Sequence, residues 1–391
     1  LTLDGTSDVD GTITISTGIV DANGAFDATN GTITLTGAGN LNLFSTVTDL
    51  GTLSDNFGTV TYDGVDQVVF SDIYYNLTAG GGSGTKTLGG AVTVAGVFTV
   101  DTLVTTAMGG NNLTVTDETD INGTITISTA TLDANGAFDA TGGTITFTDA
   151  GNLTLDSTVT SLGTLSDNFG TVTYDGIDQT VFSDVYYSLT AGGGSGTKTL
   201  AGAVTVAGDL TIDTDVTIAM DTHDLTVTNA TDIDGTLAVA DNTLTLDGSS
   251  DIDGTITIST GTVDANGTFD ATSGFVTFTN VGNLTLFSTV IDLGTLTNNY
   301  STVIYDGADQ VVFSDVYYNL TAGGGSGTKT LGGNVTVEND LTIDTDVTIS
   351  MDIHDLTVTD TTDIDGTLAV ADNTLTLDGS SDVDGTITIS T

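Results

Sequence analysis

The feature of this 391-residue chain that most constrains its fold is a long internal repeat. The segment Thr59–Lys86 returns at Thr171–Lys198 and again at Thr302–Lys329. These spacings divide the chain into repeat 1 (residues 1–112), repeat 2 (113–243), repeat 3 (244–374) and the start of a further repeat (375–391). Such a chain is expected to form a stacked array in which each structural unit contacts only its neighbours.

The difference in length between the repeats predicts the size of one structural unit. Repeats 2 and 3 are each longer than repeat 1 by one segment, which in repeat 2 is Gly235–Asp253 and has no counterpart in repeat 1. An insertion that leaves its flanks unchanged is most simply one whole unit. We therefore expect units of about 19 residues, with six in repeat 1 and seven in each of repeats 2 and 3.

Short runs that alternate apolar and hydroxyl residues fill each unit. Examples are GTITIST at Gly11–Thr17 and AVTVAG at Ala91–Gly96. A period of two predicts β-strands, and the runs end at Gly, Asn or Asp. Three strands with their corners account for one unit, which predicts an all-β, three-sided parallel β-solenoid of about 20 coils. A sandwich or barrel also uses short strands, but it gives no reason for a one-unit insertion. The absence of proline fits, because nearly every solenoid strand is bonded on both sides.

The composition excludes several classes of function. The chain has 52 Asp and Glu against 3 Lys and Arg, a net charge of −49, and it has no Cys. Phosphate and anionic lipid would repel such a chain, so we expect no nucleic-acid partner, and no apolar run is long enough to span a membrane. Without Cys there are no disulfides, thiolate metal sites or cysteine nucleophiles. Hydrophobic residues make up 38% and mean hydropathy is +0.20, which argues against disorder.

Aspartates recur at the 19-residue spacing and form the main candidate site. In a solenoid this spacing would stack carboxylates about 4.8 Å apart, and the two members of an Asp-x-Asp pair would share one face of a strand. Three explanations remain open: the row is screened by solvent and salt, it is neutralised by bound Ca²⁺, or some carboxylates stay protonated. The candidate calcium ligands are Asp213, Asp215, Asp232, Asp234, Asp251, Asp253, Asp344, Asp346, Asp363, Asp365, Asp382 and Asp384.

Other motifs point away from catalysis. The loop AGGGSGTKT at Ala79–Thr87 lacks the Gly-Lys-Ser/Thr order and the following helix of a phosphate-binding loop. We expect this loop to be a flexible protrusion between coils, with Lys86 on the surface as a counter-charge to neighbouring aspartates. His223 and His354 occupy one repeat position, which fits a corner and not a metal site or a catalytic base. The prediction is that the chain is not an enzyme, with a polysaccharide-active β-helix as the remote alternative.

Aromatic residues gather once in each repeat. Repeat 1 has Phe57, Tyr62, Phe70 and the adjacent pair Tyr74 and Tyr75, and the other repeats have their counterparts. This cluster predicts a thicker stretch of core. Because successive strand residues point to opposite sides, one ring of the Tyr-Tyr pair must face outward, where it could touch a neighbouring filament or a glycan.

The phrases at Tyr317–Asp344 and Asp264–Asn280 resemble the repeat arrays of large secreted bacterial surface proteins. These are the β-solenoids of adhesins, autotransporter passengers and filamentous-haemagglutinin-like proteins. The resemblance implies an extracellular or cell-surface structural protein that forms or belongs to a filament. The alternative is an adhesin stalk whose binding domain lies outside these residues. Expected partners are further copies of the chain, through end-to-end or lateral contacts, together with cations and glycans.

Overall fold

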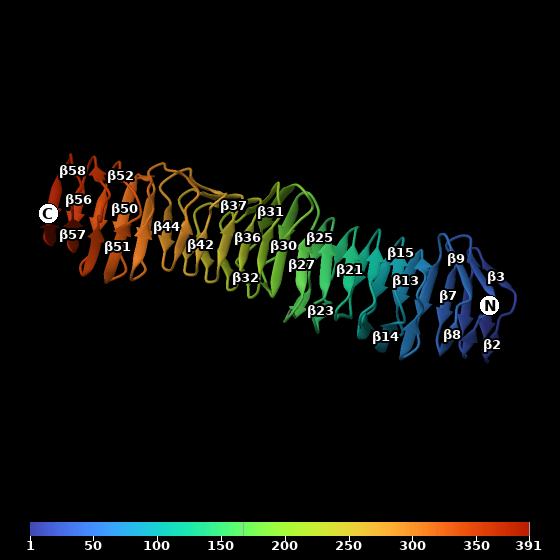
Figure 1. Cartoon of the computed structure of the whole chain (residues 1–391). Coiled ribbons are helices and arrows are strands. Elements are labelled where there is room, and N and C mark those ends of the chain that lie inside the picture. Colours follow the sequence, from blue (N-terminus) through green and yellow to red (C-terminus); the bar gives the residue numbers. More distant parts are fainter. Residues whose placement is uncertain (167, 391) are drawn as a thin grey trace. The chain divides into compact units, whose positions relative to one another are not determined.

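The computed structural model describes residues 1–166 and 168–390, so Asp167 and the last residue of the predicted further repeat, Thr391, lie outside it. The chain divides into unit 1, Leu1–Gly193, and unit 2, Gly194–Thr391. The described residues contain no helix and 60 short β-strands, which stack in parallel as a solenoid. The predicted all-β parallel β-solenoid is therefore confirmed (Figure 1).

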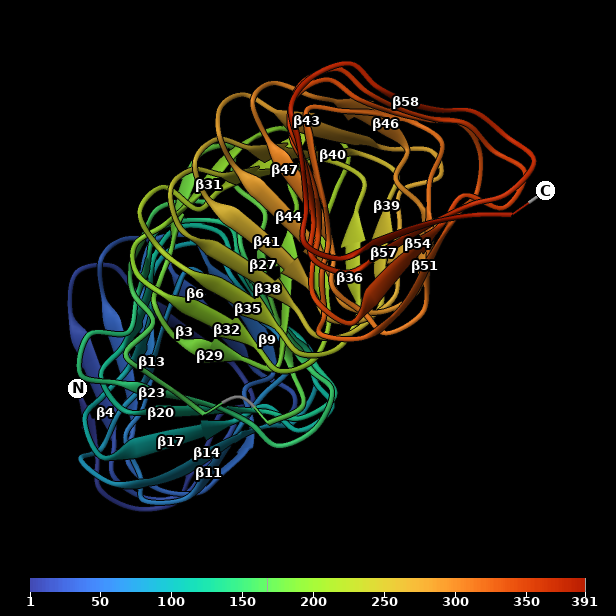
Figure 2. The same cartoon turned by 90° about the vertical axis from the view of Figure 1, so that its left-hand side faces the viewer.

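Each coil is made of three successive strands that belong to three different sheets. Strand β1 pairs with β4, β2 with β5 and β3 with β6, so a strand bonds to the third strand after it except where a sheet ends. In the view of Figure 2 the coils of each unit wind around an interior. The register places like on like: Thr12 lies opposite Thr32, and Ile13 opposite Ile33.

Unit 1 has three faces, which we name A, B and C. Face A consists of β1 (Thr2–Leu3), β4 (Ile19–Ala22), β7 (Asn40–Leu43), β10 (Thr59–Tyr62), β13 (Asn76–Ala79), β16 (Phe98–Val100), β19 (Thr119–Ile121), β22 (Phe138–Asp139), β25 (Val159–Ser161) and then β28 (Gln179–Val181). Face B consists of β2 (Ser7–Asp8), β5 (Phe26–Asp27), β8 (Val47–Asp49), β11 (Gln67–Val69), β14 (Gly84–Leu88), β17 (Val104–Ala107), β20 (Thr124–Ile127), β23 (Thr144–Phe147), β26 (Thr164–Ser166) and then β29 (Val185–Tyr186). Face C consists of β3 (Thr12–Ile15), β6 (Thr32–Leu35), β9 (Thr52–Asp55), β12 (Ile73–Tyr74), β15 (Val92–Val94), β18 (Leu113–Val115), β21 (Thr131–Ala134), β24 (Asn152–Leu155), β27 (Thr171–Tyr174) and β30 (Ser188–Ala191).

Unit 2 also has three faces, which we name D, E and F. Face D consists of β31 (Gly196–Leu200), β34 (Val216–Ala219), β37 (Thr236–Val239), β40 (Thr255–Ile258), β43 (Phe275–Phe278), β46 (Thr295–Thr297), β49 (Val316–Tyr317), β52 (Val335–Val337), β55 (Leu356–Val358) and β58 (Leu375–Leu377). Face E consists of β32 (Val204–Val206), β35 (Leu225–Val227), β38 (Thr243–Leu246), β41 (Thr262–Ala265), β44 (Asn283–Leu286), β47 (Thr302–Tyr305), β50 (Asn319–Ala322), β53 (Leu341–Ile343), β56 (Thr362–Ile364) and β59 (Ser381–Val383). Face F consists of β33 (Leu210–Ile212), β36 (Thr231–Ile233), β39 (Ser250–Ile252), β42 (Phe269–Asp270), β45 (Val290–Asp292), β48 (Gln310–Val312), β51 (Gly327–Leu331), β54 (Val347–Ser350), β57 (Thr367–Val370) and β60 (Thr386–Ile389).

The core of each unit is the interior of its coils. Along a typical strand such as β20, the isoleucines Ile125 and Ile127 are buried while Thr124 and Thr126 face outward. Because the register stacks the same positions in successive coils, apolar side chains form continuous rows inside. Burial of apolar surface in these rows is the main term that stabilises the solenoid.

The sequence repeats do not contain whole numbers of coils. The strands that open the repeats are β1, β18, β38 and β58, so the three repeats hold 17, 20 and 20 strands. At three strands a coil, repeat 1 has five and two-thirds coils and the others six and two-thirds, which corrects the expected six and seven. The cause is that some coils are longer than the insertion, as between Ile19 and Asn40, which lie opposite each other. Each repeat therefore begins one face away from the last: in unit 1, β1 lies on face A and β18 on face C.

The 19-residue insertion is one complete coil, as expected. Gly235–Asp253 contains β37, β38 and β39, which are one strand on each of the three faces of unit 2. Its removal would join Asp234 to Gly254 and restore the sequence pattern found at Thr119–Thr129 in repeat 1.

We expect the chain without residues 235–253 to fold as the parent does, because the coils on either side of the deletion present matching rows to each other. The melting temperature followed by circular dichroism should stay within about 5 °C of the parent. A deletion of residues 235–244 is the control, since half a coil cannot reach all three faces and should cause a much larger loss. Equal effects of the two deletions would contradict the coil assignment.

Candidate functional site

Several of the predicted aspartates do stack in register. On face F of unit 2, Asp232 lies opposite Asp251 and Asp251 opposite Asp270. The row continues to Asp292, which the 19-residue spacing did not include. On face E, Asp363 lies opposite Asp382. Asp232, Asp251, Asp363 and Asp382 are exposed. The aspartates thus form short rows on different faces of unit 2 and not one continuous line.

Asp213 and Asp344 lie elsewhere than predicted. The register places Thr211 opposite Asp232 and Thr342 opposite Asp363, so each of these coils is two residues longer than the aspartate spacing implies. The two additional residues form a turn after β33 and after β53. In these turns Asp215 and Asp346 have a φ of 66°, so neither Asp213–Asp215 nor Asp344–Asp346 is a same-face strand pair.

The remaining candidates follow the strands at corners. Asp234 comes directly after β36, Asp253 after β39, Asp365 after β56 and Asp384 after β59, and all four are exposed. Partial desolvation, and then repulsion from these neighbouring carboxylates, raises the pKa of Asp232, Asp251 and Asp363 above the usual range. In the part of the chain that the structure describes, no three His, Cys, Asp or Glu side chains are placed to hold a metal ion together. Calcium binding stays a prediction.

The raised pKa values make the stability of this row depend on pH. A carboxyl whose pKa is higher in the folded state stabilises the fold when protonated, and that contribution is lost as the pH rises through its folded pKa. We therefore expect Asp251→Asn to raise the melting temperature at pH 7 in low salt and to have little effect at about pH 3, below the unfolded pKa. About 1 M NaCl should reduce the difference in melting temperature between this variant and the parent at pH 7, because salt screens the repulsion between carboxylates. Asp241→Asn, which removes an exposed carboxylate at a corner, is the control. A destabilised Asp251→Asn protein at pH 7 would contradict this account.

A second site lies where the hydrogen-bonded ladder of face B is interrupted. β8 is the last strand of one sheet and β11 is the first strand of the next. The side chain of Gln67 fills this break. Its Nε2 donates to the carbonyls of Leu43 (2.9 Å) and Ser45 (2.7 Å), and its Oε1 accepts from the amide of Gly64 (2.7 Å). One side-chain amide thus provides hydrogen bonds that a neighbouring backbone would otherwise make.

Lys86 is buried beside this glutamine. Its exposed fraction is 0%, and its Nζ donates to the carbonyls of Gly64 and of Val65 (3.3 Å to the latter). The expected surface counter-charge on a flexible protrusion is therefore wrong. Desolvation lowers the pKa of Lys86, while the nearby Asp63, Asp66 and Asp101 act to raise it. The glycines of the preceding loop let the chain approach so closely: Gly84 has a φ of 94°, and a Cβ there would lie 1.7 Å from the carbonyl oxygen of Val65.

A pair of buried tyrosines completes this polar cluster. The hydroxyls of Tyr62 and Tyr74 are 3.0 Å apart, and their rings meet edge to face. The amide of Phe70 donates to Tyr62 Oη and the carbonyl of Phe70 accepts from Tyr74 Oη, so one residue of the chain holds both hydroxyls. Burial raises the pKa of Tyr62 to about 12, which keeps it neutral. Tyr62 and Tyr74 of the predicted aromatic cluster thus lie in the core, where polar groups hold them, whereas Phe57 of that cluster is exposed.

The same cluster occurs at the same position of repeat 3. In unit 2 the amide of Gln310 bonds to Leu286, Ser288 and Gly307, Lys329 is fully buried, and the hydroxyls of Tyr305 and Tyr317 are 3.1 Å apart. We name the Gln, Lys and paired Tyr at each ladder break the seal cluster. A signal for it was in the sequence: the chain has only three Gln and three Lys, and each set occupies one repeat position. Such rare residues at fixed positions indicate a specific structural role.

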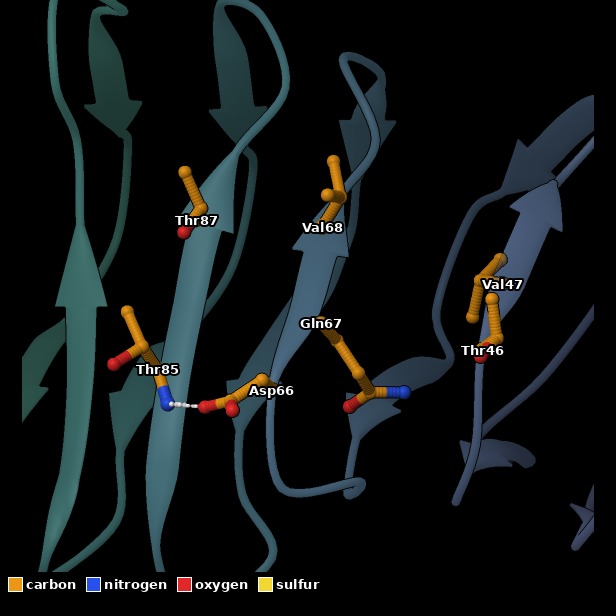
Figure 3. Close-up of a pocket in the computed structure, with 7 residues that line it drawn as sticks. All are labelled: Thr46, Val47, Asp66, Gln67, Val68, Thr85 and Thr87. Carbon is orange, nitrogen blue, oxygen red and sulfur yellow. Dashed lines mark hydrogen bonds between the residues drawn. The ribbon is translucent and has the colours of Figure 1, made fainter.

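A shallow groove lies on the outer side of the seal cluster (Figure 3). It has a volume of about 510 Å³ in unit 1 and is lined by Thr46, Val47, Asp66, Gln67, Val68, Thr85 and Thr87. Asp66 accepts a hydrogen bond from the amide of Thr85 at 2.9 Å, so its carboxylate ties two successive coils together. An equivalent groove of about 360 Å³ lies in unit 2. The groove contains no histidine and no pair of opposed carboxylates, the groups that general acid–base chemistry uses most.

Replacement of Gln67 by Leu tests the seal cluster. The change keeps a similar volume but removes three hydrogen bonds, which should cost about 1–3 kcal/mol of local stability. Hydrogen exchange measured by mass spectrometry should speed up across residues 40–75. Val68→Leu, at the neighbouring exposed position, is the control. Unchanged protection in Gln67→Leu would show that its hydrogen bonds do not hold the break together.

The other predicted elements of the site are corner structures. His223 and His354 lie in turns, where their amides donate to the carbonyls of Met220 (3.0 Å) and Met351 (2.9 Å). No helix among the described residues is long and apolar enough to cross a membrane.

Comparisons with protein-family models, curated proteins and solved structures found no match to the chain.

Proposed function

We propose that this chain is an extracellular structural protein, part of a β-solenoid filament or fibre on or around a microbial cell. The observation that supports this most directly is the seal cluster. Where the ladder is interrupted, buried Gln, Lys and Tyr side chains restore hydrogen bonds between coils, and the arrangement recurs in unit 1 and unit 2. A protein whose role is to hold an extended stack of coils together needs such continuity.

The distribution of charge supports the same role. The three lysines are fully buried, and the chain has no arginine, so the charged side chains that face solvent are carboxylates. A surface of one sign keeps separate molecules hydrated and apart, and it attracts cations from the medium. Both properties suit a protein that is exposed outside a cell at high local density.

Immunogold electron microscopy on the organism that makes the protein tests the proposal. The folded full chain is the antigen, because a peptide from the seal-cluster segment, residues 59–86, would raise antibodies against buried groups. Gold should label intact, unpermeabilised cells, on fibres or on material surrounding them. A strain without the gene is the control for antibody specificity. Label that appears only after permeabilisation, inside the cell, would overturn the proposal.

A further inference from the structure

Each repeat has a pair of aromatic rings at its surface next to its seal cluster, and in each pair the first ring is exposed and the second is at least partly exposed. In unit 1, Phe57 packs against Tyr75 with ring centroids 5.5 Å apart, and Phe57 is 58% exposed. The next repeat has Phe169 against Tyr187 at 5.9 Å, and in unit 2 Tyr300 packs against Tyr318 at 5.1 Å. An aliphatic side chain that is also exposed precedes the second ring by two residues in all three copies: Ile73, Val185 and Val316. Large exposed apolar groups that cluster in this way indicate an interaction surface.

The first ring of each pair is aromatic in all three repeats although it lies outside the core. The first ring is Phe, Phe and Tyr in the three repeats, so aromatic character persists although the side chain changes. In the third copy Tyr300 has a φ of 58°, a left-handed conformation that is unfavourable for a bulky side chain and that Gly or Asn would adopt more easily. Because Tyr300 is mostly exposed and its backbone conformation is unfavourable, its ring indicates a role other than stabilising the fold.

The placement of the two pairs in unit 1 argues against a second copy of the chain as the partner. Tyr75 immediately precedes β13 on face A, whereas Tyr187 precedes β30 on face C. The pairs therefore lie at different corners, one at each edge of face C, and they point in different directions. The net charge of −49 adds repulsion between copies. A partner that reaches each pair separately fits this arrangement better.

The neighbouring polar groups favour a neutral partner over a cationic one. Asp55, whose carboxylate accepts from the amides of Gly58 and Tyr75, is replaced by Asn298 in repeat 3 while both rings remain. Asp72 is kept as Asp184 and Asp315, but in each copy its carboxylate accepts a hydrogen bond from the next amide, which is a structural reason to keep it. The rings are thus constant, whereas the carboxylate of Asp55 is not, and the carboxylate that is constant already serves the backbone.

We propose that the exposed aromatic pairs bind neutral polysaccharide. The positively polarised C–H groups on one face of a pyranose ring pack favourably on the negative face of an aromatic ring. Such a sugar brings no charge that the carboxylate surface would repel, and the hydroxyls around its edge can donate to nearby oxygen atoms. Each pair binds weakly, and the chain gains affinity when one polysaccharide strand contacts several pairs. The inference goes beyond the structural role and holds whether or not the chain forms a filament.

Native affinity electrophoresis of the full chain tests this inference. Gels are cast without polysaccharide, or with soluble dextran, mannan or hydroxyethylcellulose. We expect at least one polysaccharide to retard the protein, and the combined variant Phe57→Ala, Phe169→Ala and Tyr300→Ala to bind it about tenfold more weakly. Phe57→Tyr, Phe169→Tyr should keep the binding, since repeat 3 already has Tyr at this position. Val281→Ala, Ile353→Ala removes exposed aliphatic groups and is the control.

Three results would overturn the inference. One is that none of the three polysaccharides retards the parent protein. Another is retardation that the ring-to-alanine variant retains in full, with circular dichroism showing that the variant is folded. The third is ring-dependent binding of soluble polylysine or ring-dependent dimers in sedimentation, without polysaccharide binding, which would identify a cationic partner or a second copy instead.

Discussion

The parallel hydrogen-bonded ladder is the interaction on which the rest of this structure depends. Because a strand bonds to the third strand after it except at the ladder breaks, residues of successive coils lie in register and side chains stack on their equivalents. For Ile, Val and Leu this stacking builds the core. For Asp232, Asp251 and Asp270 it brings like charges together, and this repulsion adds to desolvation in raising the pKa of Asp232 and of Asp251. One geometric rule thus produces both the main stabilising feature and the main electrostatic cost.

The interruptions of the ladder show how the structure copes when that rule fails. Between β8 and β11 the backbones do not pair, and buried polar atoms would be left without partners. Gln67 supplies an amide of the same chemistry as a peptide group, and Lys86 supplies further donors to the carbonyls beside it. Tyr62 and Tyr74 fill the space and bond to Phe70. Side-chain hydrogen bonds thus take the place of backbone pairing at these positions.

Much of this fold could be predicted from the sequence, because the period of two and the insertion of one coil are properties of local pattern. The register of the aspartates was only partly predictable, since two additional residues in the turn after β33 shift Asp213 relative to Asp232. The rotation of each repeat by one face could not be predicted from a mean coil length. It depends on coils of unequal length, from the short coil that brings Asn76 opposite Thr59 to the long one between Ile19 and Asn40. The burial of Lys86 contradicts the general preference of lysine for solvent. The only sequence signal for this burial was that all three lysines occupy the same repeat position.

The burial of the three lysines also determines which enzymes can attack the protein. Proteases of the trypsin type cut after lysine or arginine, and this chain offers them only Lys86, Lys198 and Lys329. All three have an exposed fraction of 0%. For cleavage, the coil that carries the lysine must first open, together with the hydrogen bonds that its strand makes to the coils on either side. An environment rich in such proteases would therefore digest neighbouring proteins and leave the folded solenoid intact.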